Sequence, residues 1–167
     1  MKPGSRAPTR AVIRKRVAAP RERVFRAWTE AEQLRHWFFP GSAAAPVPQV
    51  EVDLRVGGRY CLTTYAPDGT IEARVGGTYH VVHPPVKLVF SWAWEAPDPD
   101  PAETLVTVEL HEVEGMTEIV VTHERWPALA AQEGPTIGWH CCLARLAQLV
   151  EATGQPYVPV AHTAPCR

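Results

Sequence analysis

The chain has 167 residues, of which 46% are hydrophobic and 21% charged, a composition that excludes disordered and fibrous classes and allows a single sizeable core. Its 17 basic and 18 acidic residues give a net charge of −1, so we expect no nucleic-acid partner. The sequence contains neither a run of about 18 apolar residues for a membrane span nor the apolar core of a secretory signal. We therefore expect a cytoplasmic protein with no membrane partner.

The first part of the chain predicts one strand followed by two short helices. Apolar and basic residues alternate over residues 9–17, as in an edge strand. Pro20 then opens a helix, since proline is tolerated in a first turn. Thr29 and Glu32 have the spacing of a capping box and predict that the helix restarts as a second segment ending at Trp37.

From Val50 the hydrophobic period changes from 3.6 to 2, which predicts a long antiparallel meander. One strand of it, over residues 70–82, is expected to carry an inward face that includes Val75, Tyr79 and Val81. The pair Gly76–Gly77 within this strand is read as a bend. Together with the first strand, the meander predicts a sheet of six to seven strands.

The last predicted element is a long helix that begins near Thr136, carries an apolar stripe and ends before Gly154. A sheet and a helix that each bury one face predict an α+β, helix-grip fold, in which a curved antiparallel sheet wraps around the long C-terminal helix. We expect residues 9–153 to form one domain, with residues 1–8 and 154–167 as flexible termini.

Six strings follow one another along the chain, namely PRERVFRAWTEAEQLRHWF, VDLRVGGRY, APDGT, LVFSWAW, TEIVVTHE and GWHCCLARL. In this order they resemble the START-like, or SRPBCC, superfamily, and most closely its branch named after activators of the ninety-kilodalton heat-shock chaperone ATPase. The resemblance implies a helix-grip fold with a cavity for hydrophobic ligands under the last helix. For most bacterial-type members it implies no assigned reaction.

His123 is the one candidate catalytic residue. Counting by two from Ile119 and Val121 places its imidazole on the face that looks into the grip, where a histidine can act as a base near neutral pH. The alternative is a histidine that is held by hydrogen bonds to neighbouring elements. The residue types alone leave both interpretations open.

No metal site and no cofactor are predicted. His140, Cys141 and Cys142 are adjacent, and adjacent helical residues point about 100° apart, so they cannot converge on one ion. Neighbouring cysteines also seldom bridge, and we expect the four cysteines of the chain to be reduced.

Six tryptophans against four phenylalanines suggest large apolar walls with polar tips. Such walls suit an aromatic or lipid-like ligand, although filling of the core explains the same residues. The expected ligand-binding residues are Trp37, Tyr60, Tyr79, Phe90, Trp92, Trp94, His123, Trp139 and Leu143.

Three functions follow, in order of preference. The first is binding of a hydrophobic small molecule in a cavity between the long helix and the sheet, with no assigned reaction. The second is an enzyme of the cyclase, dehydratase or hydrolase kind that uses the same cavity. The third is a regulator that binds a chaperone or another protein. The chain is expected to be a monomer or a homodimer.

Overall fold

The computed structural model describes residues 9–38, 43–96, 103–126 and 133–152. Seven strands and three helices lie in these ranges, in the order expected from the sequence. They are β1 (Thr9–Val17), α1 (Arg21–Thr29), α2 (Ala31–Trp37), β2 (Gln49–Val52), β3 (Arg59–Tyr65), β4 (Ile71–His83), β5 (Lys87–Ala96), β6 (Thr104–Val113), β7 (Met116–Trp126) and α3 (Glu133–Glu151).

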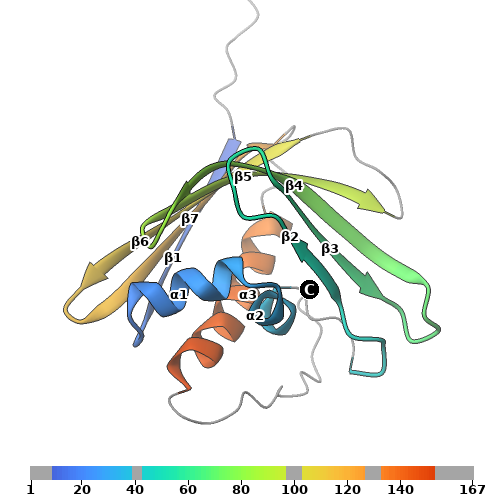
Figure 1. The fold of residues 1–167 in the computed structure, drawn as a ribbon, viewed down its shortest axis with the longest axis horizontal. Coiled ribbons are helices and arrows are strands. Elements are labelled where there is room, and N and C mark those ends of the chain that lie inside the picture. Colours follow the sequence, from blue (N-terminus) through green and yellow to red (C-terminus); the bar gives the residue numbers. More distant parts are fainter. Residues whose placement is uncertain (1–8, 39–42, 97–102, 127–132, 153–167) are drawn as a thin grey trace, which may run out of the picture.

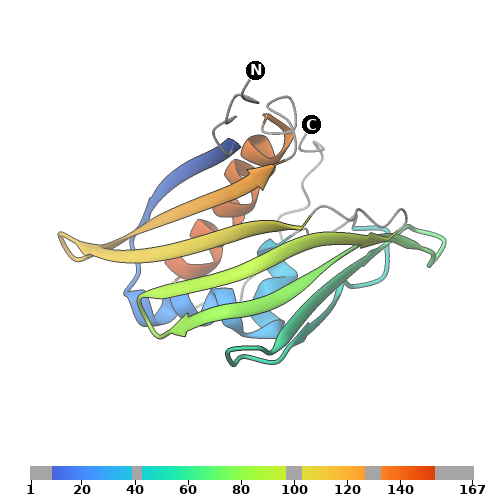
Figure 2. The ribbon, with the colours of Figure 1, turned by 90° about the horizontal axis from the view of Figure 1, so that it is seen from above.

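The strands form one antiparallel sheet in the order β1-β7-β6-β5-β4-β3-β2. The sheet is curved and covers one side of the three helices, with α2 near β2 (Figure 1). Seen from above, the long strands β4 to β7 run across the helices (Figure 2). The α+β helix-grip fold is therefore confirmed, and β1 lies at an edge of the sheet as expected.

The junction of α1 and α2 differs from the sequence expectation. Thr29 does not cap α2: its hydroxyl donates a 2.9 Å hydrogen bond back to the Phe25 carbonyl oxygen, one turn earlier. Glu30 is the N-cap residue of α2 and makes no side-chain capping bond. The predicted capping box is wrong because threonine can bond to the preceding turn of its own helix instead.

In β4 the alternation of side chains between the two faces of the sheet is interrupted at His80. Tyr79 pairs with Phe90 and Val81 pairs with Val89, so β4 carries one extra residue between these pairs. A β-bulge of this kind shifts the following side chains to the other face. Val81 is therefore exposed rather than inward-facing, and Val82 packs against the core in its place.

The helix α3 begins at Glu133, somewhat earlier than expected, and buries its apolar stripe. It packs against β1, α1 and α2. The buried residues of the stripe are Trp139, Cys142, Leu143, Leu146, Ala147 and Val150. The two predicted flexible termini lie outside the described residues, and none of the described helices is long and apolar enough to cross a membrane.

Candidate functional site

A cavity lies between the helical pair α1–α2 and the strands β2 to β5. Its empty space, including the open side, is about 330 Å³, and only a small part of this space is wide enough for a water molecule. That space holds one or two waters, so a larger ligand would have to displace lining side chains. The described lining residues are Trp28, Leu34, Phe38, Val50, Tyr60, Leu62, Tyr79 and Phe90, and none of these is charged.

Three aromatic rings form the sheet side of the cavity. Tyr60, Tyr79 and Phe90 lie on adjacent strands, with ring centroids 5.2 to 6.1 Å apart. Strand alternation places each of them on the inner face, where they are 3 to 6% exposed. Burial raises the pKa of both tyrosines, that of Tyr60 well above its usual value, so both phenols stay neutral at physiological pH.

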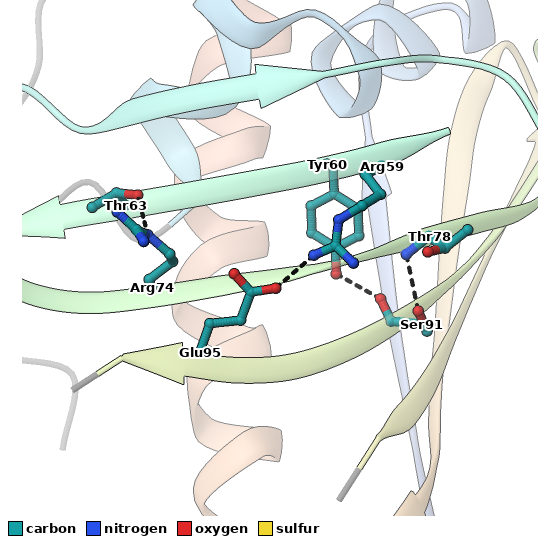
Figure 3. A network of polar contacts seen from close by, with 7 residues as sticks. All are labelled: Arg59, Tyr60, Thr63, Arg74, Thr78, Ser91 and Glu95. Carbon is teal, nitrogen blue, oxygen red and sulfur yellow. Dashed lines mark hydrogen bonds and ion pairs between the residues drawn. The ribbon is translucent and has the colours of Figure 1, made fainter. Parts of the chain in front are cut away.

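Tyr60 is held by a hydrogen bond that crosses an intervening strand. Its hydroxyl donates to the Ser91 carbonyl oxygen on β5 at 2.8 Å, while the Thr78 amide donates to Ser91 Oγ at 2.9 Å (Figure 3). Tyr60 pairs with Gly77 on β4, and a methyl group at Gly77 would collide with the Ser91 carbonyl oxygen. The missing side chain at Gly77 therefore lets β4 and β5 approach closely beside the bridging tyrosine.

On the exposed side of the sheet, the residues near the Tyr60–Ser91 hydrogen bond are polar. Arg59 pairs with Glu95 at 2.6 Å, and Arg74 Nε donates to Thr63 Oγ1 at 3.1 Å (Figure 3). Arg59 is largely exposed. These charges belong to the outer face and do not line the cavity.

A second aromatic group, which lies in the core beside the cavity, contains most of the predicted ligand-binding tryptophans. Trp28 contacts Trp37 at 4.6 Å and Trp139 at 5.8 Å between ring centroids, and Trp92 lies 5.7 Å from Trp139. Trp37 is fully buried, and its indole N–H donates to the Ala27 carbonyl oxygen at 2.8 Å. The space that we expected a ligand to occupy is therefore filled by side chains, namely those of Trp37, Trp92 and Trp139.

His123 is enclosed by this second group and is 1% exposed. The indole N–H of Trp139 donates to His123 Nδ1 at 3.0 Å, which leaves the proton of the neutral ring on Nε2. Nε2 lies 2.7 Å from Thr104 Oγ1, and the Thr104 hydroxyl donates to the Trp92 carbonyl oxygen at 3.1 Å. One continuous chain of hydrogen bonds thus joins α3, β7, β6 and β5.

Burial lowers the pKa of His123 to about 3, so the ring is neutral at physiological pH. Both ring nitrogens are engaged, and the residue does not line the described cavity. This geometry matches a histidine that is held by hydrogen bonds to neighbouring elements. It does not offer a base to a molecule in that cavity.

The described cavity therefore shares three residues with the predicted set, namely Tyr60, Tyr79 and Phe90. Trp139 and Leu143 of α3 are not among its lining residues, and Trp94 is 36% exposed near the end of β5. The position differs from the expected one because α3 packs toward β1, whereas α1 and α2 lie on the cavity side.

Five lining residues were not predicted as ligand contacts. Leu62 could have been found, because it lies two residues after Tyr60 and so shares its strand face. Trp28 lies on the first predicted helix and Phe38 directly follows the second, and in the sequence both look like ordinary core residues. Leu34 and Val50 carry no sequence signal that separates a cavity wall from an ordinary core contact.

Among the described residues no group of three or more histidine, cysteine, aspartate or glutamate side chains could hold a metal ion. Cys142 is buried and Cys61 is half-buried, and neither of them forms a disulfide. Cys141 is disulfide-bonded. The expectation of four reduced cysteines is wrong, because adjacency disfavours only the bridge between Cys141 and Cys142.

Residues 18–151 match the family model described as Activator of Hsp90 ATPase homolog 1-like protein. The chain belongs to this family. The resemblance seen in the six sequence strings is thereby confirmed over nearly the whole described domain.

Several solved structures share the fold of this chain. The chain is similar to a protein from Chromobacterium violaceum, with 25% identity, a TM-score of 0.71 and coverage of 85% of this chain and 96% of that chain. It is also similar to an HSP90 activator from Plasmodium falciparum, with 26% identity, a TM-score of 0.61 and coverage of 81% and 91%. A protein from Rhodobacter sphaeroides shares the fold, with 24% identity, a TM-score of 0.72 and coverage of 87% and 93%. No curated protein matches the sequence.

Proposed function

We propose that the protein binds an apolar small molecule in the cavity between α1–α2 and the sheet. The observation that carries the proposal is the composition of the wall: eight apolar or aromatic side chains, contributed by both helices and by four strands, surround a space that the core does not fill. Small-molecule sites are typically concave, mostly apolar and lined by aromatic residues.

The size of the space sets a condition on binding. Typical small-molecule pockets measure roughly 300–1,000 Å³, whereas the enclosed part of the space here has room for only one or two waters. A ring-sized ligand therefore requires the lining side chains to separate. We expect binding to be accompanied by a change in the fluorescence of Trp28, the only tryptophan among the described lining residues.

The test uses N-phenyl-1-naphthylamine, a neutral probe whose fluorescence rises in apolar surroundings. The variant Val50→Phe places a larger side chain at the cavity wall, and Val52→Phe makes the same change on the same strand at a residue that packs on the core without lining the cavity. We expect the probe to bind the wild type and Val52→Phe but not Val50→Phe. Equal binding by both variants would place the probe elsewhere and contradict the proposal.

A second candidate function is regulation of a chaperone ATPase, which the family match and the similarity to an HSP90 activator support. Its test is the ATPase rate of the chaperone from the same organism, measured with increasing amounts of this protein. Saturable stimulation supports this function, and an unchanged rate together with failure to co-purify contradicts it. An enzymatic function is not proposed, because both nitrogens of His123 are engaged within the core.

A further inference from the structure

Two polar groups of the cavity residues lack a hydrogen-bond partner within the described part of the chain. The indole Nε1 of Trp28 is buried and unpartnered. The hydroxyl of Tyr79 likewise has no hydrogen bond to a described residue, whereas the neighbouring Tyr60 hydroxyl donates to Ser91. Both Trp28 and Tyr79 are 3% exposed, and they lie on opposite walls, one on α1 and one on β4.

Unpartnered polar groups in a buried wall need a physical explanation. More than about 90% of buried polar groups in folded proteins are hydrogen-bonded, because an unsatisfied buried donor is destabilising. This penalty falls on the Trp28 indole N–H, whereas the Tyr79 hydroxyl is not among the fully buried atoms. Because no described residue bonds to it, the Tyr79 hydroxyl is available to a molecule in the cavity.

The cavity favours an uncharged partner for these donors. No charged side chain is among the described lining residues, and Arg59, the nearest cation in sequence to Tyr60, pairs with Glu95 on the outer face. A carboxylate in this space would lose its hydration without gaining a counter-ion, which is strongly unfavourable. A carbonyl or ether oxygen avoids that cost and can still accept a hydrogen bond.

We infer that the ligand is an uncharged, mostly apolar molecule with a hydrogen-bond acceptor, which the Tyr79 hydroxyl anchors and the Trp28 indole N–H assists as a second donor. The inference rests on the proposed function, since it names the class of molecule that the same cavity takes. Tyr79 is thus a specificity-determining residue: it selects an oxygen-bearing ligand over a hydrocarbon of the same shape.

The experiment compares three probes with one carbon skeleton: indane, 2-indanone and indane-2-carboxylate. Each is titrated against bound N-phenyl-1-naphthylamine with the wild type, with Tyr79→Phe and with Tyr65→Phe. The last variant is the matched control, because the exposed Tyr65 hydroxyl bonds to Gln49 Oε1 outside the cavity. Tyr79→Phe removes only an oxygen atom with no described partner, so we expect it to fold normally.

For the wild type we expect 2-indanone to bind more tightly than indane and the carboxylate to bind least. In Tyr79→Phe the affinity for 2-indanone should fall about fivefold, as expected for the loss of one neutral hydrogen bond, while that for indane stays the same. Tyr65→Phe should behave as the wild type.

The proposed function and the role of Tyr79 would fail in different ways. If none of the probes, including N-phenyl-1-naphthylamine, binds the wild type, the proposed function fails and the inference fails with it. If indane and 2-indanone bind but Tyr79→Phe weakens both equally or neither, the cavity binds ligands and the role of Tyr79 is wrong. Tightest binding of the carboxylate would overturn the conclusion that the ligand is uncharged.

Discussion

Trp139 donates a 3.0 Å hydrogen bond from its indole N–H to Nδ1 of His123 and thereby fixes which ring nitrogen of the histidine carries the proton. Because an indole nitrogen can only donate, His123 must accept there and donate from Nε2 to Thr104. The direction of every bond in the chain from α3 to β5 follows from this single contact. The chain is complete only while the histidine is neutral.

Acidification should therefore destabilise the fold through His123. Its pKa is about 3 in the folded protein against 6.5 for the free side chain, so between these values the unfolded chain binds a proton that the folded chain does not. The stability from this residue is fully present above pH 6.5 and is lost as the pH falls toward 3. The loss amounts to about 1.4 kcal/mol for each pH unit.

Urea unfolding near pH 7 and near pH 5 tests this expectation against His123→Gln, which keeps an acceptor and a donor but does not titrate. The wild type should lose about 2 kcal/mol more than the variant between the two conditions. If the free energy of unfolding falls by the same amount in both proteins, the pKa of His123 does not differ between the folded and unfolded states as proposed.

Thr104→Val should destabilise the protein by about 1–3 kcal/mol, because it keeps the shape of the side chain but leaves the His123 Nε2–H without its acceptor. Thr104→Ser retains the hydroxyl and should lose less than half as much. Thermal and urea unfolding at neutral pH provide the measurement. Similar losses in both variants would indicate that packing of the methyl group, rather than the hydrogen bond, stabilises this position.

Gly77→Ala should destabilise the fold by at least about 3 kcal/mol, since the new methyl group meets the Ser91 carbonyl oxygen, which is backbone and cannot rotate away. Gly138→Ala is the control: apart from its chain neighbours and the backbone of its own helix, no atom lies within 4 Å of the added methyl group, and the position is inside α3. Alanine there should stabilise the helix by up to about 1 kcal/mol. A tolerated Gly77→Ala would mean that β4 and β5 can separate without loss.

The two cavity tyrosines should respond differently to loss of the hydroxyl. Tyr60→Phe removes the bond to the Ser91 carbonyl and should lower the free energy of unfolding by about 1 kcal/mol. Tyr79→Phe removes no described hydrogen bond and should leave stability unchanged or slightly higher. Denaturant unfolding of both variants without ligand checks the difference, and a larger loss at Tyr79 would contradict it.

Strand alternation was sufficient to predict the inner face of the sheet wherever the period of two is unbroken. Tyr60, Phe90, Val121 and His123 all lie on that face as expected. The prediction was wrong for Val81, because a bulge is a single extra residue that the hydrophobic pattern of the strand does not reveal.

The position of the cavity was the main feature that the sequence did not reveal. Whether Trp139 meets a ligand or another side chain depends on which helices pack against which strands, and a single helical stripe contains no information on that choice. Trp37 illustrates this. Its helical position predicted an inward side chain, but only the structure shows that its ring packs against Trp28 and that its indole N–H bonds to the Ala27 carbonyl oxygen.

The close approach of β4 and β5 at Gly77 links three positions that are distant in the sequence. A relative that gains a side chain at the position of Gly77 must move the Ser91 carbonyl away, and the reach of the Tyr60 hydroxyl to that oxygen is then lost. We therefore expect residues 60, 77 and 91 to covary among homologues, with tyrosine at the first position found together with glycine at the second. In protein engineering, these three positions should be transplanted as a set, since the hydrogen bond from residue 60 and the close approach of β4 and β5 depend on all three.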